Sequence, residues 1–397
     1  MRAFDIIKDG SFEIVPEDEL RTKLEKSEKS KKPLRIKYGI DPTGSDVHIG
    51  HLVPIRKMRQ FQDLGHTGVI IIGDFTAQIG DPTGRDTSRP TLSKDRVIQN
   101  SKRYMEQLYY VLDKEKTEVH YQSEWFGKMS MKDVLKLMGK FTLAQFMAHE
   151  TFRIRYEKGL SLGLHELMYP ILQAYDSVAI ASDVELGATE QKFNLLQGRV
   201  MQNYFGLPPQ VAIMSPILMG TNGVTKMSKS DNNYIGVLDS AADKFGKTMS
   251  IPDDLIVDYF KYATASSAKQ IEQIGADIAK GETNPKDIKM ELARQITSLY
   301  HSPQETKNAE DQFNNIFINR QTPDEIPLFV AKQPMWIVKL LTASNLCNSS
   351  SDARRMITQR AVSVDGKKIE DINFVVEENC TIKLGKRKFL KFEVDLV

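Results

Sequence analysis

The segment from residue 34 to residue 72 constrains the fold most, because it reads as strand, glycine-containing turn, helix and strand in succession. Residues 34–38 alternate like a strand, and residues 39–44, Gly-Ile-Asp-Pro-Thr-Gly, break it. Apolar side chains at 52, 55, 58, 61 and 64 follow helical spacing, with Gly65 as a stop signal. Residues 69–72 form a wholly apolar strand, as in parallel sheets buried on both faces. The sequence therefore predicts a βαβ unit within an α/β fold that has a doubly wound parallel sheet.

The rest of the chain is predicted to be helical for long stretches and to end in a small mixed module. Residues 96–181 and 252–317 have mostly helical patterns, one helix opening at Asn284-Pro285, and residues 211–214 look like a further strand. Prolines 323, 327 and 334 mark a linker, followed by an apolar stretch, a capped helix at 350–357 and an Asp-Gly hairpin at 362–369. We expect an N-terminal polar arm (1–32), a Rossmann-like domain (33–235), an α-helical domain (236–330) and a small α+β domain (331–397).

Composition excludes several classes of protein. With 41% hydrophobic and 27% charged residues and a mean hydropathy of −0.37, the 397-residue chain is typical of soluble globular proteins. It has no run of 18 apolar residues and no apolar leader after the N-terminus, so we expect no membrane span and no signal peptide. Two cysteines are too few for a disulfide framework or a four-cysteine zinc site, which favours a reducing cytoplasm and no protein-bound metal.

Charge is distributed unevenly along the chain. Residues 335–397 carry eleven Lys plus Arg against eight Asp plus Glu, a net charge of +3, so the remainder of this +2 chain carries −1. The basic excess therefore lies in the last segment, where it suits a polyanionic partner.

The tetrapeptide His-Ile-Gly-His at residues 48–51 occupies the turn of the predicted βαβ unit. His48 and His51 lie three residues apart at the start of the helix, where both imidazoles can donate hydrogen bonds to phosphate oxygens as charge develops. Gly50 lets the backbone approach a nucleotide. A histidine pair at this spacing is also compatible with a structural or surface position, and its place after a strand and before a helix favours the phosphate-binding interpretation.

The pentapeptide Lys-Met-Ser-Lys-Ser at residues 226–230 follows about 180 residues later. Lys226 and Lys229 flank Ser228 on a predicted loop, where two ammonium groups can neutralise phosphates and stabilise a departing pyrophosphate. A solvated loop is the alternative reading of this string alone. Together, and in this order, the two motifs resemble the signature of the class I aminoacyl-tRNA synthetases.

Tyr169, Gln173 and Asp176 stand at i, i+4 and i+7, which puts all three on one face of a helix. Because proline is tolerated only in a first turn, Pro170 predicts a helix start near residues 165–166. Three polar groups on one face can bind an amino group and a phenol oxygen. A polar solvent-facing side of the helix is an equally good reading of the spacing alone.

Several longer stretches resemble bacterial tyrosyl-tRNA synthetase: residues 39–43, 73–84, 172–176 and 187–191, with a tail similar to the S4-type RNA-binding fold. The resemblance covers residues 33 to 397. It implies tyrosine activation with ATP and Mg²⁺, transfer to tRNA(Tyr), and a homodimer. The tyrosine-binding residues that it implies are Asp41, Thr76, Asp81, Tyr169, Gln173, Asp176 and Gln191. The ATP-binding residues are Gly39, Asp41, Thr43, His48, Gly50, His51, Glu190, Met227, Ser228 and Lys229, with His48, His51, Lys226 and Lys229 as the catalytic set.

Within this resemblance, Tyr169, Gln173 and Asp81 would hold the α-ammonium of tyrosine, and Asp176 would accept a hydrogen bond from the phenol. Glu190 would lie near the ribose and Thr76 beside the substrate ring. In the basic tail we expect tRNA phosphates to contact Arg354, Arg355, Arg360 and Lys386.

The sequence departs from the better-known branch of this family at four positions. Lys37 stands where many members have a tyrosine that contacts the substrate hydroxyl, and it receives no role here. Ala188 replaces a glycine, Glu190 an aspartate and Lys192 a tryptophan. The intact second motif indicates a sub-branch rather than a loss of activity.

Three other functions share some of these features. A tryptophan–tRNA ligase would have both motifs, but the tail and the Tyr169, Gln173 and Asp176 set count against it. An inactive RNA-binding protein on a synthetase scaffold would not need His48, His51, Lys226 and Lys229. A small nucleotidyltransferase would lack the helical and S4-like segments.

Overall fold

The computed structural model describes residues 2–42, 44, 46–79, 93–281, 283–318, 327–385 and 388–394. The chain divides into two compact units, residues 1–306 and 307–397, which are described separately below. Of the residues singled out from the sequence, Thr43, Asp81 and Lys386 lie outside the described residues.

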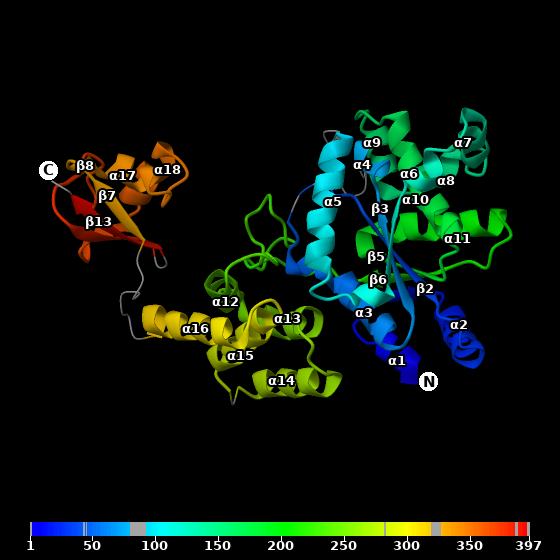
Figure 1. The fold of residues 1–397 in the computed structure, drawn as a ribbon, viewed down its shortest axis with the longest axis horizontal. Coiled ribbons are helices and arrows are strands. Elements are labelled where there is room, and N and C mark those ends of the chain that lie inside the picture. The colour runs from blue at the N-terminus through cyan, green and yellow to red at the C-terminus, as the bar shows by residue number, and fades with distance from the viewer. Residues whose placement is uncertain are drawn as a thin grey trace. The chain divides into compact units, whose positions relative to one another are not determined.

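A six-stranded sheet organises the first unit (Figure 1). Five strands are parallel, and the edge strand β1 pairs antiparallel with β6. In spatial order the strands are β1 (Glu13–Val15), β6 (Val211–Ser215), β5 (Val184–Ala188), β2 (Arg35–Ile40), β3 (Thr67–Ile72) and β4 (Thr117–Tyr121). The predicted α/β class and parallel sheet are confirmed.

The strand order reverses direction between β2 and β5. From β2 the chain proceeds outward through β3 to β4, and it then returns to build β5 and β6 on the other side of β2. The carboxyl ends of β2 and β5 therefore border the point of an open α/β sheet where ligands bind.

Alternating side chains of the central strands bury both faces of the sheet. Ile70 and Ile72 belong to the large core that includes the apolar side of α3 (Leu52–Asp63), whereas Val69 and Ile71 pack on the opposite face. Burial on both sides explains why residues 69–72 are wholly apolar.

Helices cover this sheet and form a separate group after it (Figure 1). Up to β6 they are α1 (Arg2–Lys8), α2 (Glu17–Ser30), α3 (Leu52–Asp63), α4 (Thr76–Ile79), α5 (Lys94–Leu108), α6 (Ser123–Phe126), α7 (Met131–Met138), α8 (Leu143–Met147), α9 (Glu150–Glu157), α10 (Leu164–Ala179) and α11 (Lys192–Tyr204). After β6 follow α12 (Ala241–Met249), α13 (Ile256–Ala263), α14 (Ala268–Lys280), α15 (Pro285–Ser298) and α16 (Pro303–Phe313), the last of which spans the boundary between the units. Short turns of 3₁₀ helix are Ile49–His51, Lys114–Lys116, Thr189–Gln191 and Asp253–Leu255, and Asn314–Ile318 is a π-helical turn.

Two helix predictions have different outcomes. α15 begins at Pro285 with the Asn284 side chain accepting from the N–H of Lys286, as predicted. α10 begins at Leu164, so Pro170 is its seventh residue, and the prediction that Pro170 lies in the first turn is wrong. The helix tolerates a proline that cannot donate to the carbonyl of Glu166, because tertiary packing buries this part of α10.

The N-terminal segment differs from the expected polar arm. α1 and α2 place Phe4, Ile7, Leu20 and Leu24 in the large core, and β1 extends the sheet. The charged run in α2 hides this role, because its buried positions are few and widely spaced.

The second unit contains a mixed sheet and two helices. Its five-stranded sheet has the order β10 (Lys367–Lys368), β9 (Val362–Val364), β12 (Cys380–Leu384), β13 (Lys388–Val394) and β7 (Leu328–Ala331). A second, two-stranded sheet pairs β8 (Met335–Trp336) with β11 (Val375–Val376), and the helices are α17 (Ile337–Ala343) and α18 (Ser350–Thr358). The predicted hairpin is present, with Asp365 and Gly366 at positive φ in its turn.

Among the described residues, no helix combines the length and apolar character needed to cross a bilayer. The same residues contain no group of three or more His, Cys, Asp or Glu side chains arranged to hold a metal ion.

Candidate active site

The two sequence motifs meet at the switch point of the sheet. His48 forms an isolated bridge with Gly236, just after the second motif, and the N–H of Ile49 donates to Ile235 O at 3.0 Å. A Cβ atom on Gly50 would lie 3.1 Å from Nδ1 of His48 and 3.4 Å from Cβ of Met227. A side chain at position 50 would have to push these neighbours apart by a few tenths of an ångström, so glycine favours close packing of the two motifs.

The rings of His48 and His51 stack with centroids 3.5 Å apart. The backbone N–H of His48 donates to Nδ1 of His51 at 3.3 Å, which places the proton of the neutral His51 ring on Nε2. Nδ1 of His48 is buried and has no hydrogen-bond partner within the described part of the chain. Nδ1 of His48 is therefore an unsatisfied polar atom, and Nε2 is the nitrogen of His51 that can donate a hydrogen bond.

Both histidines are neutral at physiological pH. Burial lowers the pKa of His48 far below its usual range, with further lowering by His51 and Lys229. Burial and then Lys229 lower the pKa of His51 to about 4. These rings can therefore act as neutral hydrogen-bond donors and not as cations.

Asn233 shapes the loop that carries the second motif. Its Oδ1 accepts from the N–H of Ser228 at 2.7 Å, and its Nδ2 lies 2.8 Å from Oγ1 of Thr225 and 3.1 Å from the carbonyl of Lys226. Met227 is buried, and its N–H donates to Leu218 O at 3.0 Å. Asn233 was not found from the sequence, because an asparagine that follows a loop has no distinctive pattern.

The two lysines of the second motif have different surroundings. Nζ of Lys226 bonds to both carboxylate oxygens of Glu190, at 2.9 and 3.1 Å, in a half-exposed pair. Lys229 lies beside Gly44, whose hypothetical Cβ would be 3.2 Å from Nζ. Burial lowers the pKa of Lys229, and Asp46 raises it. Glu190, expected near the ribose, is held by Lys226 in this structure.

Asp41, directly after β2, connects two other predicted tyrosine-binding residues, Tyr169 and Thr76. The hydroxyl of Tyr169 donates to its Oδ2 at 2.8 Å, and the hydroxyl of Thr76 donates to its Oδ1 at 2.6 Å. A Cβ on Gly73 would lie 2.1 Å from the same Oδ1, so only glycine permits this contact.

Asp176 is buried and lines the same small cavity as Asp41 and Tyr169. Gln122 Nε2 donates to Oδ2 at 2.8 Å and Trp125 Nε1 donates to Oδ1 at 3.1 Å. Burial raises the pKa of Asp176 to about 7, although nearby Lys37 and the Gln122 hydrogen bond oppose the rise. Gln122 and Trp125 come from the turn after β4 and were missed, because no sequence spacing connects them to α10.

Lys37 is neither paired directly with Asp176 nor exposed to solvent. Its side chain is 0% exposed, and Nζ lies 3.0 Å from Oε1 of Glu185, a residue directly opposite on β5. Nζ also donates to the carbonyl of Gln173 at 2.7 Å and to the hydroxyl of Ser177 at 2.8 Å. Two opposite charges inside apolar strands were the signal that could have revealed this pair.

Gln173 is held by this pair from two sides. Its Nε2 donates to Oε1 of Glu185 at 3.0 Å, while Lys37 binds its backbone carbonyl. Oε1 of Gln173 is buried without a hydrogen-bond partner among the described residues. The buried pair therefore orients the Gln173 amide so that its nitrogen is bonded and its oxygen, Oε1, remains as an acceptor without a donor among the described residues.

These side chains enclose a small cavity of about 20 Å³, which has room for about one water. Its lining includes Gly39 and Gln191 together with Asp41, Tyr169, Gln173 and Asp176. A ligand of amino-acid size must therefore displace side chains.

The predicted tRNA-binding cations of the second unit lie on its surface. Arg355 and Arg360 form ion pairs with Asp352 and Glu370, at 2.5 and 3.0 Å. Arg354 lies over the ring of Trp336, with 5.6 Å between the guanidinium carbon and the ring centroid. All three side chains are exposed and can exchange these partners for phosphates.

Comparisons with known proteins agree with this geometry. Residues 29–318 match the family described as tRNA synthetases class I (W and Y), and residues 318–390 match the C-terminal domain described as Tyrosine–tRNA ligase SYY-like. The chain therefore belongs to the class I tRNA synthetases of the tryptophan and tyrosine group.

Within that group its relatives are tyrosine–tRNA ligases. The enzyme from Carboxydothermus hydrogenoformans is 47% identical over 98% of this chain and 97% of its own length. The one from Thermotoga maritima is 43% identical over 97% of this chain and 96% of its own length. A solved tyrosyl-tRNA synthetase from Archaeoglobus fulgidus, complexed with L-tyrosine, has the same fold, with a TM-score of 0.63 and 20% identity over 78% of this chain and 99% of its own.

Proposed function

We propose that this chain is a tyrosine–tRNA ligase that forms tyrosyl-adenylate from tyrosine and ATP and transfers the tyrosyl group to tRNA. The observation that carries the proposal is the buried carboxylate of Asp176, which accepts hydrogen bonds from Gln122 and Trp125 and lines a small cavity together with Tyr169 and Gln173. The near full-length identity to tyrosine–tRNA ligases supports it.

In the activation step, a carboxylate oxygen of tyrosine attacks the α-phosphorus of ATP. A carbon–oxygen–phosphorus linkage forms, the bond from the α-phosphorus to the bridging oxygen breaks, and pyrophosphate leaves. No side chain need act as a nucleophile, because positioning and stabilisation of charge carry the reaction. ATP brings Mg²⁺ as part of the substrate, and no residue of this chain is assigned as its ligand.

At the phosphate end, neutral His51 donates from Nε2, and Lys229 supplies the nearest cation. Lys226 must exchange Glu190 for a phosphate, which is inexpensive because a half-exposed ion pair contributes only about 0–1 kcal/mol. Glu190 is then released toward the ribose, which reconciles its predicted role with its present partner.

At the amino-acid end, Gln173 and Tyr169 receive the α-ammonium and Asp176 receives the phenol. The orientation of Gln173 supports this assignment, because its partnerless Oε1 is the type of atom that an ammonium requires. Lys37 and Glu185 act as positioning residues, since they hold the amide and the backbone of Gln173 without reaching the pocket themselves.

The second step transfers the tyrosyl group to the terminal ribose hydroxyl of tRNA, which attacks the carbonyl carbon and releases AMP. The exposed cations Arg354, Arg355 and Arg360 support phosphate contacts from the second unit. We expect a homodimer, as the family resemblance implies.

Amino-acid-dependent exchange of labelled pyrophosphate into ATP tests the activity. We expect exchange with tyrosine and none with tryptophan. Exchange with tryptophan alone would make the chain a tryptophan–tRNA ligase, and no exchange with either would favour an inactive RNA-binding protein.

A further inference from the structure

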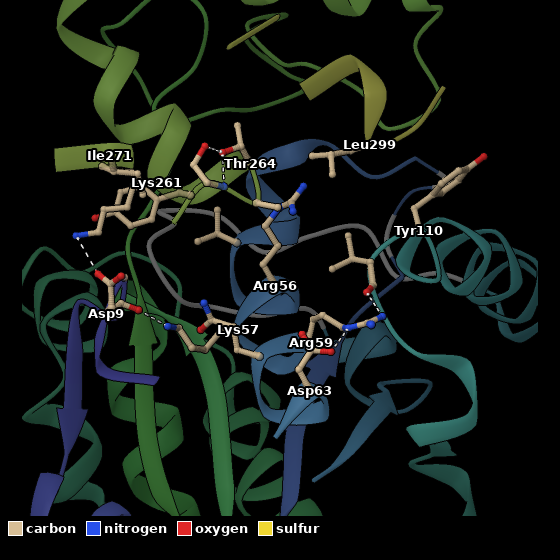
Figure 2. A pocket seen from close by; sticks show the side chains of 17 residues that line it. Asp9, Arg56, Lys57, Arg59, Asp63, Tyr110, Lys261, Thr264, Ile271 and Leu299 are labelled. Atoms are coloured by element: carbon tan, nitrogen blue, oxygen red, sulfur yellow. Dashed lines mark hydrogen bonds and ion pairs between the residues drawn. The ribbon is translucent and has the colours of Figure 1, made fainter. Parts of the chain in front are cut away.

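A second cavity lies away from the switch point, between α3 and the helices that follow β6 (Figure 2). Its volume is about 370 Å³, within the range of about 300–1,000 Å³ typical of small-molecule sites. Arg56, Lys57 and Arg59 of α3 line one side, and Lys261 and Thr264 line the other. None of the active-site residues named above borders it.

The lining is positively charged. Four cations, Arg56, Lys57, Arg59 and Lys261, face two carboxylates, Asp9 and Asp63, which leaves two positive charges in excess. An anion is the ligand that this excess favours, and low-dielectric walls strengthen the attraction.

Two of the four cations are already engaged. Arg59 Nε bonds to Oδ1 of Asp63 at 2.8 Å. Lys57 is only 5% exposed, and its ammonium donates to the carbonyls of Ile7 and Asp9 at 2.9 and 2.5 Å. Lys261 is held loosely, with its nitrogen 3.9 Å from Oδ1 of Asp9.

Arg56 forms no ion pair with a carboxylate among the described residues, and unlike Lys57 it does not bond to backbone carbonyls instead. Its Nη2 donates to the hydroxyl of Tyr300 at 3.1 Å, and its Nε is buried with no hydrogen-bond partner. Figure 2 shows Arg56 reaching from α3 toward Thr264, across the space between the two walls. One turn further along α3, Oε1 of Gln60 is also buried without a partner. An unmatched donor and an unmatched acceptor at one cavity are costly unless a ligand satisfies them.

We propose that this cavity binds a phosphate group, with Arg56 as its main ligand and Lys261 as the second cation. A guanidinium presents a planar fork that fits phosphate oxygens, and the ammonium of Lys261 on the opposite wall adds a second positive charge. Gln60 accepts a hydrogen bond from a hydroxyl of the same ligand. The phosphate belongs either to a small phosphorylated molecule or to the backbone of tRNA.

A phosphate bound here links the two helices that support the phosphate-binding motifs. α3 begins directly after His51. α13 contains Tyr259, whose hydroxyl donates at 2.7 Å to the carbonyl of Met219, a residue that is itself bridged to Lys226. This coupling rests on the proposed function, whereas binding at the cavity does not.

Calorimetric titration of the full-length protein with inorganic phosphate tests the site. The switch-point crevice is first saturated with an unreactive tyrosyl-adenylate analogue, so that the histidines and Lys229 are covered. We expect Arg56→Gln to weaken phosphate binding at least about tenfold, the effect of losing a charged hydrogen bond. Arg294→Gln is the control, because Arg294 is an arginine of α15 that pairs with Glu291 and does not line the cavity, and this variant should bind phosphate as the unmodified chain does.

Charging of tRNA at several salt concentrations distinguishes the two sources of phosphate. If the ligand is tRNA backbone, Arg56→Gln raises the KM for tRNA and reduces the salt slope by about one, with tyrosine activation unchanged. If the ligand is a small molecule, the KM for tRNA stays the same and only the phosphate titration changes. The proposal is overturned if Arg56→Gln, folded by circular dichroism, matches Arg294→Gln in both assays.

Discussion

The two ends of the crevice are built in different ways. At the phosphate end, His48 lies beside Gly50 and Lys229 lies beside Gly44. Lys226, the other lysine of the second motif, is half exposed. At the amino-acid end, Asp176 and the Lys37–Glu185 pair are almost completely buried and already hydrogen-bonded. ATP and pyrophosphate must enter and leave, so the first end stays open. Recognition of one amino acid needs fixed groups whose mismatch is expensive, so the second end is closed.

The largest expected effect concerns the closed end. Asp176→Ala should remove most tyrosine activation. It should also bring the kcat/KM values for tyrosine and phenylalanine within about tenfold of each other, because pocket shape alone discriminates by roughly 1–3 kcal/mol. Tyrosyl-tRNA synthetases are the known example in which phenylalanine is rejected by about 10⁵ without editing, and that magnitude is adopted from the family. The kcat/KM values for the two amino acids in pyrophosphate exchange provide the measurement. A variant that still prefers tyrosine by orders of magnitude would show that another residue reads the hydroxyl.

The next effect concerns the open end. Lys229→Ala should slow adenylate formation by about 10²–10³ while tyrosine affinity changes little, because the ammonium acts on charge that grows at the departing pyrophosphate. Single-turnover kinetics separate the rate from binding. An unchanged rate with a raised dissociation constant for tyrosine would place Lys229 with the amino-acid end instead.

A paired substitution tests whether the buried charges position Gln173. Lys37→Met alone leaves Glu185 buried without its cation and should destabilise the fold by about 3–5 kcal/mol. Adding Glu185→Leu should recover most of that stability, since a buried ion pair replaced by apolar groups is often neutral. The double variant should nevertheless bind tyrosine about tenfold or more weakly, because the Gln173 amide is no longer held. Equal tyrosine affinity in the stable double variant would reduce the pair to a purely structural role.

The two ends should also differ in their response to pH. The pKa of Asp176 is near 7, and its ionised form accepts the hydrogen bond from the phenol. As pH increases toward 7, tyrosine affinity should therefore increase by up to about tenfold per pH unit, and above pH 7 it should level off. Its pKa is raised from 3.8, so its contribution to stability is present below about pH 4 and is lost as pH rises through about 7. The histidines, neutral above about pH 4, should add no step in ATP affinity between pH 5.5 and 8. Equilibrium dialysis with each substrate across this range provides the comparison, and a step in ATP affinity near pH 6.5 would contradict the assignment of neutral rings.

The smallest effect on stability is expected from the half-exposed ion pair between Lys226 and Glu190. Glu190→Gln should change the free energy of unfolding by no more than about 1 kcal/mol. It should nevertheless raise the KM for ATP if the carboxylate turns to the ribose once Lys226 engages phosphate. Denaturant unfolding and steady-state kinetics on the same preparation measure both, and an unchanged KM for ATP would leave Glu190 as a surface partner only.

The same contrast explains what could be predicted from the sequence. The phosphate end depends on residues close together in the chain, so short motifs and a βαβ pattern were sufficient to locate His48, His51 and Lys229. The amino-acid end depends on Gln122 and Trp125, more than fifty residues before Asp176, and on Lys37, which meets Glu185 only through the pairing of β2 with β5. Helical spacing identified Tyr169, Gln173 and Asp176, but no local pattern records what they face.

Errors in the fold prediction have similar causes. Pro170 obeys a local rule that tertiary packing overrides. The N-terminal segment looked like a solvated arm because its few buried residues are separated by charges, and its strand pairs only with residues about two hundred positions later.

That pairing has a consequence for how the protein is made. Residues 13–15 leave the ribosome about two hundred residues before their partner strand, residues 211–215. This segment must therefore remain unpaired, with Phe4, Ile7 and Leu20 exposed, until the rest of the sheet has assembled. A fusion that delays the pairing of this segment would lower the yield of folded protein, because the edge of β6 would remain open to pair with another nascent chain.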